Sequence, residues 1–351
     1  MYPPITVTSL PEHIHSEREL EDTLAEPSDA DLQCAARLDG DVLIVGAGGK
    51  MGPSLARRVN RAVMRTGARI RVLAASRFSS ADVRAGLESD GVETIACDLL
   101  DPASISALPR APNILFLAGR KFGTLDRTDL TWATNTVVPA RVAEHFRDSR
   151  MVVFSTGNVY PLVDANRSGA REDDPPAPVG EYAQSCLGRE RVVEFVSHEH
   201  GMRALIYRLN YAVDLRYGTL VDIARKVFTD EPIDLTMGYF NAIWQGDANS
   251  YAFRSLELCV SPPAILNVTG AERIGVREAA QWFGTVFDRT PRFVKTEGPV
   301  ALLSDSSRCR ELLGPAQVPL ATLQQWVAHW VQSGGASLGK PTHFEVTDGR
   351  F

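Results

Sequence analysis

The sequence predicts an α/β fold built on a doubly wound parallel sheet, followed by a smaller C-terminal α/β region. Three observations lead to this prediction. Short apolar runs alternate with helical patterns from residue 41 to about residue 215, as they do where helices cover both faces of a parallel sheet. A glycine-rich turn directly follows the first apolar run. Beyond residue 215 the alternation becomes irregular, which indicates a region of different organisation.

The first strand is predicted from its uniform hydrophobicity. Val42-Leu43-Ile44-Val45 is a continuous apolar run, which is typical of a strand buried on both faces. Later strands are expected at 70–74, 94–96, 113–117, 151–155 and 204–207, with helices at 53–66, 81–87, 102–108, 131–147 and 182–198. Each strand therefore leads through a helix to the next, which is how parallel strands are connected.

The chain divides into four predicted segments. Residues 1–40 form an N-terminal extension, which we expect to be a packed surface addition with helices at 17–24 and after the capping pattern Ser28-Asp29-Ala30-Asp31. Residues 41–215 form the sheet domain. Residues 216–335 form the smaller region, with helices at 218–228, 246–259, 275–287 and 320–333 and strands near 232–236 and 264–268. Residues 336–351 form a tail.

Composition argues against several classes of function. The 351 residues carry 37 basic and 43 acidic side chains, for a net charge of −6, which gives no basic surface for nucleic acid. No apolar run reaches the roughly 18 residues of a membrane-spanning helix, and the polar N-terminus is unlike a signal peptide. The five cysteines and the His13/His15 and His198/His200 pairs lack metal-ligand spacing. We therefore expect a cytoplasmic protein without a metal site.

The strongest local signal is Val45-Gly46-Ala47-Gly48-Gly49-Lys50-Met51-Gly52, between the first strand and its helix. Gly46 permits a tight turn, and Gly49 lets the backbone approach a pyrophosphate that the helix N-terminus stabilises. Gly52 permits close packing of helix on strand. Strand, glycines and helix in this order indicate a Rossmann dinucleotide site. Lys50 and Met51 belong to this loop, and we expect Lys50 to be solvated although a phosphate is within its reach.

The end of the second strand bears on the choice of dinucleotide. Dinucleotide folds usually carry an acidic residue there, which binds the ribose 2′-hydroxyl. Here the chain reads Ala74-Ala75-Ser76-Arg77, and a guanidinium can hold a 2′-phosphate and stack on adenine. The sequence therefore predicts an NAD(P) cofactor, with NADP preferred over NAD. Asp98 and Leu99 follow the third strand and are expected beside the adenine. Helix capping is the alternative for Asp98.

Further segments are similar to those of the extended short-chain dehydrogenase/reductase family, in its NAD-dependent epimerase/dehydratase group. They are Leu117-Ala118-Gly119 with Arg120-Lys121, Asn135, Ser155-Thr156-Gly157-Asn158-Val159-Tyr160, Tyr182-Ala183-Gln184-Ser185-Cys186-Leu187-Gly188-Arg189-Glu190, and Arg208-Leu209-Asn210. The resemblance covers about residues 41–335. It implies that Tyr182 and Thr156 are catalytic. The cofactor contacts that it implies are Ala118, Gly119, Lys121, Asn135 and Tyr182. Its implied substrate contacts are Asn158, Asn210, Asn241, Trp244 and Gln245.

One departure from the family concerns catalysis. The family carries a lysine four residues after the tyrosine, and Cys186 stands there in this chain. A phenol has a pKa of about 10, and a cation one helical turn away favours the phenolate that removes a substrate proton. A thiol is small and usually neutral, so it supplies neither that charge nor the grip on the nicotinamide ribose.

Three interpretations of this departure remain open. Lys121 supplies the missing positive charge from the neighbouring loop, and Tyr182 still acts as the base. Alternatively, Cys186 itself reacts as a thiolate whose pKa is lowered by a helix N-terminus. In the third, catalysis is lost and the chain is a nucleotide-binding regulatory protein. We expect Arg189, on the same helix, to form a surface ion pair with Glu190 or Glu194.

Together these features predict NAD(P)-dependent chemistry at a carbinol or carbonyl carbon of a sugar, sugar acid or nucleotide sugar. Tyr182 would be the acid/base, Thr156 would hydrogen-bond the same oxygen, and Lys121 would position the cofactor. Net oxidoreduction and redox-neutral epimerisation share this first step. The helices at 131–147 and 182–198 are apolar enough to pair across a homodimer, and packing in the core of the chain is the alternative for both. The tail, with Lys340 and His343, either folds over the cleft or contacts another subunit.

Overall fold

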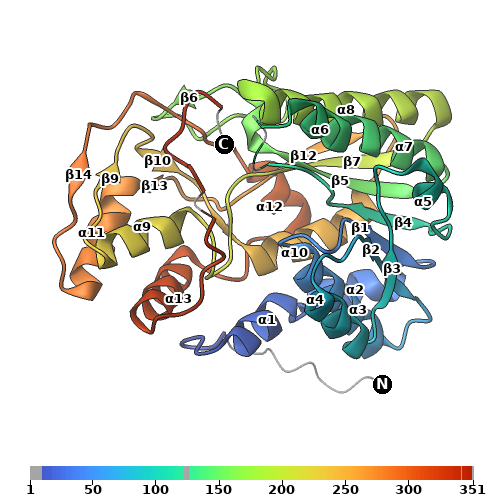
Figure 1. Ribbon diagram of the computed structural model, residues 1–351, viewed down its shortest axis with the longest axis horizontal. Coiled ribbons are helices and arrows are strands. Elements are labelled where there is room, and N and C mark those ends of the chain that lie inside the picture. The colour runs from blue at the N-terminus through green and yellow to red at the C-terminus, as the bar shows by residue number, and fades with distance from the viewer. Residues whose placement is uncertain (1–9, 122, 124–125, 341, 350–351) are drawn as a thin grey trace.

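The computed structural model describes residues 10–121, 123, 126–340 and 342–349. At its centre is a seven-stranded sheet with the order β12-β7-β5-β4-β1-β2-β3, in which every pair of neighbours is parallel (Figure 1). The strands are β1 (Val42–Val45), β2 (Val72–Ser76), β3 (Glu93–Ala96), β4 (Asn113–Phe116), β5 (Arg150–Thr156), β7 (Arg203–Leu209) and β12 (Ala264–Val268). The predicted doubly wound parallel sheet is confirmed.

Both faces of the sheet are buried, because successive side chains of each strand point to opposite sides. Val42 and Ile44 join one hydrophobic layer, and Leu43 and Val45 join the other. The first layer is covered by α2 (Asp29–Arg37), α3 (Gly52–Thr66), α4 (Ala81–Ser89), α10 (Gln245–Arg254) and α12 (Ser307–Leu313). The second is covered by α5 (Pro102–Ser106), α7 (Val138–His145) and α8 (Gly180–His200). The apolar run at 42–45 is therefore explained by burial on two sides.

A second core lies beside the sheet and contains most of the later elements (Figure 1). Its helices are α9 (Thr219–Phe228), α11 (Val276–Phe287) and α13 (Leu320–Gln332). Four two-residue strand pairs occur in the described chain: β10 (Tyr239–Phe240) with β13 (Ile274–Gly275), β11 (Ile243–Trp244) with β8 (Ala212–Val213), β14 (Phe293–Val294) with β9 (Ile233–Asp234), and β15 (Val300–Ala301) with β6 (Val163–Asp164). This part forms the far wall of the cavity described below.

The chain crosses between the two parts more often than the four predicted segments imply. Strand β12, expected within the smaller region, is the edge strand of the main sheet beside β7. Helix α10 packs on α3 and α2, and its Tyr251 and Phe253 belong to the core of the sheet. Hydrophobic periodicity identifies an element but not its distant partner, so these placements were not predictable from the local pattern.

The N-terminal extension is part of the core rather than a surface addition. Helix α1 (Glu17–Ala25) inserts Leu20 and Leu24 into the second core, and both side chains are fully buried. Ser28 caps α2 through the predicted reciprocal bonds with Asp31. The Asp31 carboxylate is buried and forms an ion pair of 2.8 Å with Arg58 of α3. This extension is therefore fixed to the sheet domain by a buried charge pair.

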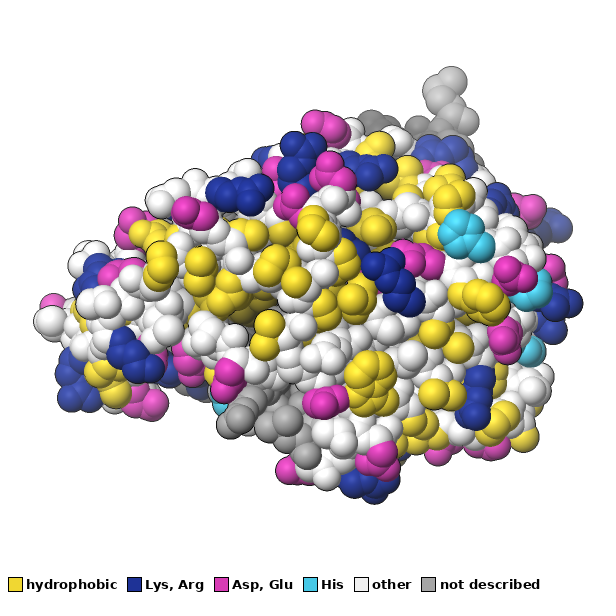
Figure 2. Space-filling model, turned by 90° about the horizontal axis from the view of Figure 1, so that it is seen from above, with side chains coloured by type: hydrophobic (Ala, Val, Ile, Leu, Met, Phe, Trp, Pro, Cys, Tyr) yellow, Lys and Arg dark blue, Asp and Glu magenta, His cyan; other side chains and the backbone are white. Residues whose placement is uncertain are grey.

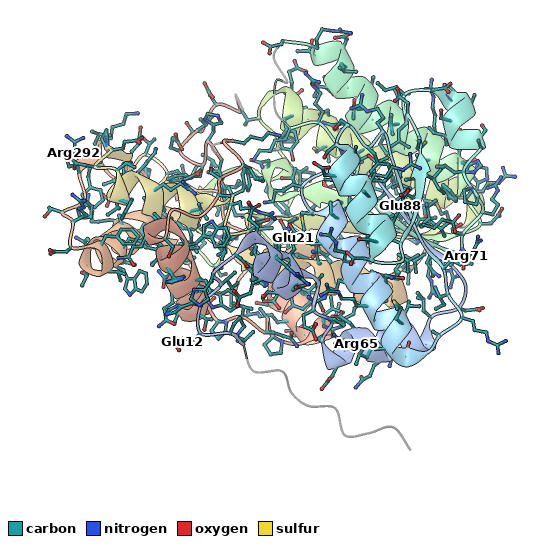
Figure 3. The ribbon with its side chains drawn as sticks, turned by 60° about the horizontal axis from the view of Figure 1, so that its bottom comes forward. Glu12, Glu21, Arg65, Arg71, Glu88 and Arg292 are labelled. Carbon is teal, nitrogen blue, oxygen red and sulfur yellow. The ribbon has the colours of Figure 1, made fainter. Side chains whose placement is uncertain are left out.

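Glu21 on α1 also links the two parts of the molecule (Figure 3). Its carboxylate accepts from Arg57 of α3 at 2.8 Å and from Arg216, in the loop before α9, at 2.7 Å. On the face seen from above, hydrophobic side chains gather around a hollow, and basic and acidic side chains are mixed around them (Figure 2). No helix within the described residues is long and apolar enough to cross a membrane.

Candidate functional site

A cavity of about 300 Å³ lies at the carboxyl ends of β1, β4, β5 and β7. This is the edge at which open α/β sheets bind their ligands. The cavity is lined by the glycine loop (Gly46, Gly49, Lys50, Met51, Gly52), the loop after β4 (Leu117, Gly119, Lys121), the end of β5 (Phe154, Ser155, Thr156, Asn158), Tyr182, the segment after β7 (Leu209, Asn210, Tyr211, Ala212, Tyr217, Gly218) and Thr342. Four separate loops and the tail therefore meet at one place.

The glycine loop has the backbone geometry that its sequence predicts. Gly46 has φ +89°, and a Cβ there would lie 2.6 Å from the Ala118 nitrogen. A Cβ on Gly52 would lie 2.3 Å from the Ala47 oxygen, so helix α3 packs too closely for any side chain. At Gly49 the nearest atom to such a Cβ is 3.5 Å away. No side chain caps the N-terminus of α3, so its first N–H groups can receive an anion.

Lys50 is not the solvated side chain that we expected. Its Nζ donates to the Ala212 oxygen at 3.2 Å and lies 3.9 Å from the centroid of the Tyr217 ring. The side chain thus extends from the glycine loop to the segment after β7, because an aromatic face and a carbonyl oxygen both attract the ammonium. Burial lowers the pKa of Lys50 to about 7.

Thr156 and Tyr182 face each other across the cavity floor. Thr156 ends β5 and Tyr182 lies in the first turn of α8, and their side chains are hydrogen-bonded. The Asn158 amide donates to Thr156 Oγ1 at 2.9 Å. Burial raises the pKa of Tyr182 above the ordinary value of a phenol, and the thiol of Cys186 adds to this increase. The guanidinium of Arg189 and the hydrogen bond to Thr156 lower this pKa, but burial outweighs them, so the phenol is neutral at neutral pH.

Cys186 lies directly beside Tyr182, to which its thiol is hydrogen-bonded. The side chain is buried, and this burial raises the pKa of the thiol. The position is also beyond the first turn of α8, where a helix N-terminus would stabilise a thiolate. These observations argue against the reactive-thiolate interpretation. Lys121 is half-buried, and burial lowers its pKa to about 8, while the neighbouring Asp222 and Cys186 act in the opposite direction.

Arg189 does not form the surface ion pair that we expected. Its guanidinium donates to the Phe154 oxygen at 2.6 Å and to Asn135 Oδ1 at 2.9 Å, and the residue is 5% exposed. A Cβ on Gly119 would lie 2.7 Å from Arg189 Nη2, so the guanidinium supports the loop after β4 from below. The neighbouring Arg191 does pair with Glu194 on the surface, at 2.7 Å.

Asn135 lies behind the cavity rather than in its lining. It sits in a π-helical turn (Ala133–Val137) that separates α6 (Thr128–Trp132) from α7, where the sequence predicted one continuous helix. Its amide accepts from the Arg120 nitrogen at 2.8 Å and donates to the Arg120 oxygen at 3.0 Å. It thereby fixes the loop that carries Lys121. Such single π-turns are common at functional sites.

A buried charge pair fixes the end of β5 to α8. Glu190 and Arg208 are both buried and form an ion pair of 2.6 Å. Ser155, next to Thr156, donates to Glu190 at 2.5 Å. Because buried charges that are paired and hydrogen-bonded allow little movement, Thr156 and Tyr182 are held at a fixed separation.

The predicted substrate contacts are divided by the structure. Asn158 and Asn210 line the cavity, and Asn241 lies behind Asn210, whose amide donates to it at 3.3 Å. Trp244 and Gln245 lie elsewhere. Gln245 donates to Ser54 of α3 at 3.2 Å, and Trp244 packs on Trp326 with ring centroids 5.2 Å apart. Gln245 therefore packs against α3 and Trp244 against α13, and neither residue lines the cavity.

The residues predicted for the adenine end also lie outside the cavity lining. Ser76 contacts the glycine loop, because its Oγ would lie 2.5 Å from a Cβ on Gly48. Arg77 and Asp98 are exposed, and Leu99 is half-buried. Asp98 accepts from the Leu100 nitrogen at 3.0 Å, while Asp101 is the residue that caps α5. These positions stay predictions for the distal end of a dinucleotide.

Sequence reasoning missed the wall formed by Tyr211, Tyr217, Gly218 and Thr342. The tail folds over the cleft, as in the first of the two placements that the sequence left open. Thr342 donates through its backbone nitrogen and its hydroxyl to Asp222 Oδ2 at 2.8 and 2.6 Å. Phe344 is buried in the second core. The tail has no periodicity that could have indicated this packing.

Comparisons with known proteins agree with this architecture. Residues 42–213 match the NAD dependent epimerase/dehydratase family. The structure of Pal from Bacillus thuringiensis is similar at a TM-score of 0.68 and 17% identity, over 84% of this chain and 99% of that one. UDP-glucuronic acid 4-epimerase from Bacillus cereus in complex with NAD is similar at a TM-score of 0.66 and 16% identity, over 83% of this chain and 98% of that one. UDP-glucose 4-epimerase from Thermotoga maritima with UDP-glucose is similar at a TM-score of 0.68 and 15% identity, over 84% of this chain and 99% of that one. No curated protein sequence matches the chain.

Proposed function

We propose that this chain, which belongs to the NAD-dependent epimerase/dehydratase family through residues 42–213, is an NAD-dependent oxidoreductase or epimerase. It acts at a carbinol or carbonyl carbon of a sugar, sugar acid or nucleotide sugar. The observation that carries the proposal is the hydroxyl pair of Thr156 and Tyr182 in the cavity that the glycine loop also lines. A proton-transferring group and a dinucleotide loop at one sheet edge are what hydride chemistry needs.

NAD is the cofactor that we propose, in place of the NADP that Arg77 first suggested. Arg77 is exposed, and an exposed arginine after a strand needs no 2′-phosphate to explain it. The similar epimerase from Bacillus cereus was solved in complex with NAD. Gly49 and the uncapped N-terminus of α3 would receive the pyrophosphate. Bound NAD would supply the hydride acceptor.

Tyr182 is proposed as the acid/base, and Thr156 as the group that holds the reacting oxygen. Tyr182 Oη would take the proton of the substrate hydroxyl as the carbonyl forms and would return it in the reverse direction. Thr156 would keep a hydrogen bond to the same oxygen. Since burial raises the pKa of Tyr182 even though the Arg189 guanidinium lowers it, this step requires a further cation. We propose Lys121 for that role, because it lines the same cavity and interacts with Cys186.

The proposal is tested by denaturing the freshly purified chain and identifying any released nucleotide by mass spectrometry. Stoichiometric NAD⁺ supports a redox-neutral enzyme that regenerates its cofactor in each cycle. An empty protein that takes up NAD or NADP on titration supports an exchanging dehydrogenase. A chain that binds neither nucleotide contradicts the proposal. Nucleotide binding without turnover on any sugar or polyol would favour the regulatory alternative.

A homodimer is the assembly that we propose. Phe195 of α8 is 61% exposed and Val179, directly before α8, is 52% exposed. Trp132 of α6 is 37% exposed. These large apolar side chains are exposed on α6, directly before α8 and on α8, and exposed apolar surface is typical of interfaces. Light scattering on the purified chain should give twice its mass of 38.4 kDa, and Phe195→Glu should give the single mass. A monomeric native chain would contradict the assignment.

A further inference from the structure

The tail closes one side of the cavity and is held at two places. Thr342 lines the cavity and is bound to Asp222 of α9 by two hydrogen bonds. Further on, Gly349 lies against the start of α8, where a Cβ on Gly349 would be 2.2 Å from the Val179 oxygen. In Figure 1 the dark red tail runs upward from α13 between the two parts of the molecule. The tail therefore bridges the second core and the sheet domain across the cleft.

The cavity wall is positively charged. Lys50 and Lys121 both line it, and none of the described lining residues is aspartate or glutamate. The two carboxylates that raise the pKa of Lys50 have other partners. Asp214 pairs with Arg216 at 2.7 Å, and Asp222 accepts from Thr342. Within the described residues, the ammonium of Lys50 contacts two neutral groups, the Ala212 oxygen and the Tyr217 ring. A half-buried cation without a carboxylate partner attracts an anion.

The cavity is also small for a cleft of this kind. Its volume is about 300 Å³, at the lower end of the roughly 300–1,000 Å³ typical of ligand pockets. The nicotinamide end of the cofactor must share this space with the substrate, since Tyr182 and Thr156 lie in the same cavity. A monosaccharide fits this requirement better than a sugar that carries a whole nucleotide.

We propose that the substrate is a small anionic carbohydrate, a monosaccharide acid or phosphate, whose anionic group binds Lys50 beside Tyr217, and that the tail excludes nucleotide sugars. This inference rests on the proposed function and narrows its substrate class. Lys50 extends away from the glycine loop to Ala212 and Tyr217, so its ammonium is directed to the substrate side of the cavity. The pyrophosphate of the dinucleotide would bind the backbone N–H groups at the N-terminus of α3 instead.

Titration calorimetry on the full chain loaded with NAD tests the inference. The probes are D-glucuronate, D-galacturonate and glucose 6-phosphate as small anions, glucose as the neutral sugar, and UDP-glucuronate as the anionic nucleotide sugar. We expect at least one small anion to bind about tenfold or more tightly than glucose, because a charge-assisted contact is worth that much. We expect UDP-glucuronate to bind more weakly than the best small anion.

Two variants test whether Lys50 is the residue that binds the small anion. Lys50→Met should remove the preference for the small anion over glucose and leave the affinity for NAD within about threefold. Lys340→Met, at an exposed lysine of the same tail, is the matched control and should change neither. Tighter binding of UDP-glucuronate, equal binding of glucose, or a Lys50→Met variant that loses NAD instead of the small anion would each overturn the inference. A chain that loads neither NAD nor NADP would overturn the proposed function itself.

Discussion

The two walls of the cavity are built in different ways. The nucleotide wall, from Gly46 to Gly52, is one continuous segment whose shape is dictated by its own glycines. The opposite wall combines residues from the segment after β7 and from the tail, and the side chain of Lys50 extends across to it. The first wall follows the glycine spacing that is typical of dinucleotide folds, whereas the second depends on contacts between segments far apart in the chain. The difference teaches that a cofactor site can be local in sequence while a substrate site is not.

The largest effect is expected from a substitution in the glycine loop, Gly46 to Gly52. Gly52→Ala would place a methyl group 2.3 Å from the Ala47 oxygen, and backbone cannot yield to it, so we expect a loss of about 3 kcal/mol or more in the free energy of unfolding. Gly49→Ala is the matched control, because its Cβ has 3.5 Å of space. It should keep its stability and lose affinity for NAD. Chemical denaturation measures the stability of both variants, and titration calorimetry measures their affinity for NAD. Equal stabilities would contradict the packing argument.

Loss of Lys121 should affect turnover and little else. Lys121→Met removes the cation that we assign to the Tyr182 phenol, so turnover should fall by about 10²-fold or more, and the affinity for NAD should stay largely intact. The pH dependence of kcat/KM should shift to higher pH in any residual activity, because the phenolate forms less readily. Lys340→Met serves again as control. Unchanged turnover in Lys121→Met would sink the assignment.

The support beneath the loop after β4 can be tested with two neighbouring arginines. Arg189→Met leaves the Phe154 oxygen and Asn135 without their buried donor, which should cost about 2–4 kcal/mol of stability. Arg191→Met removes only an exposed pair with Glu194 and should cost at most about 1 kcal/mol. Urea denaturation measures both. A smaller loss for Arg189 than for Arg191 would show that the buried guanidinium is dispensable.

The assembled wall should respond to pH through Lys50. Burial lowers the pKa of Lys50 to about 7. The neighbouring Lys121 and Arg216 also lower this pKa, whereas Asp214 and Asp222 raise it. The ammonium lies over the Tyr217 ring. A bound anion favours the protonated form and raises this pKa. Affinity for the small anion should therefore be constant below about pH 7 and fall up to tenfold for each pH unit above it. Calorimetry across this range measures the slope, and Lys50→Met should abolish it.

The smallest effect is expected from loosening the tail. Gly349→Ala would press on the Val179 oxygen at 2.2 Å, while Gly339→Ala, at a similar positive φ, meets nothing within 4 Å. Both variants carry the same backbone strain, so their difference isolates the contact with α8. We expect Gly349→Ala alone to gain several-fold in affinity for UDP-glucuronate. The clash would be relieved by displacing the end of the tail rather than a core helix, and a tail contact worth about 1 kcal/mol supports no more than that. Equal affinities of the two variants for UDP-glucuronate would show that the tail does not select the substrate.

Several of these features were predictable from local sequence and others were not. The run at 42–45, the spacing of Gly46, Gly49 and Gly52, and the cap at Ser28 each depend on neighbours a few residues away, so the sequence predicted them correctly. Arg189 was misjudged, because a charged residue is usually exposed and only the packing of Asn135 and Phe154 around it creates its buried site. Trp244 and Gln245 were assigned by resemblance alone.

The sequence by itself determined the parallel sheet, the dinucleotide loop and the presence of Cys186 in place of a lysine, because hydrophobic period, glycine spacing and residue identity are properties of short segments. Only the tertiary structure decided that β12 completes the sheet, that Lys50 crosses to Tyr217, and that Thr342 closes the cavity. Each of these contacts joins segments from tens of residues to nearly 300 apart. Their free energy comes from burial and pairing that exist only once the two cores have formed, and local pattern carries no record of it.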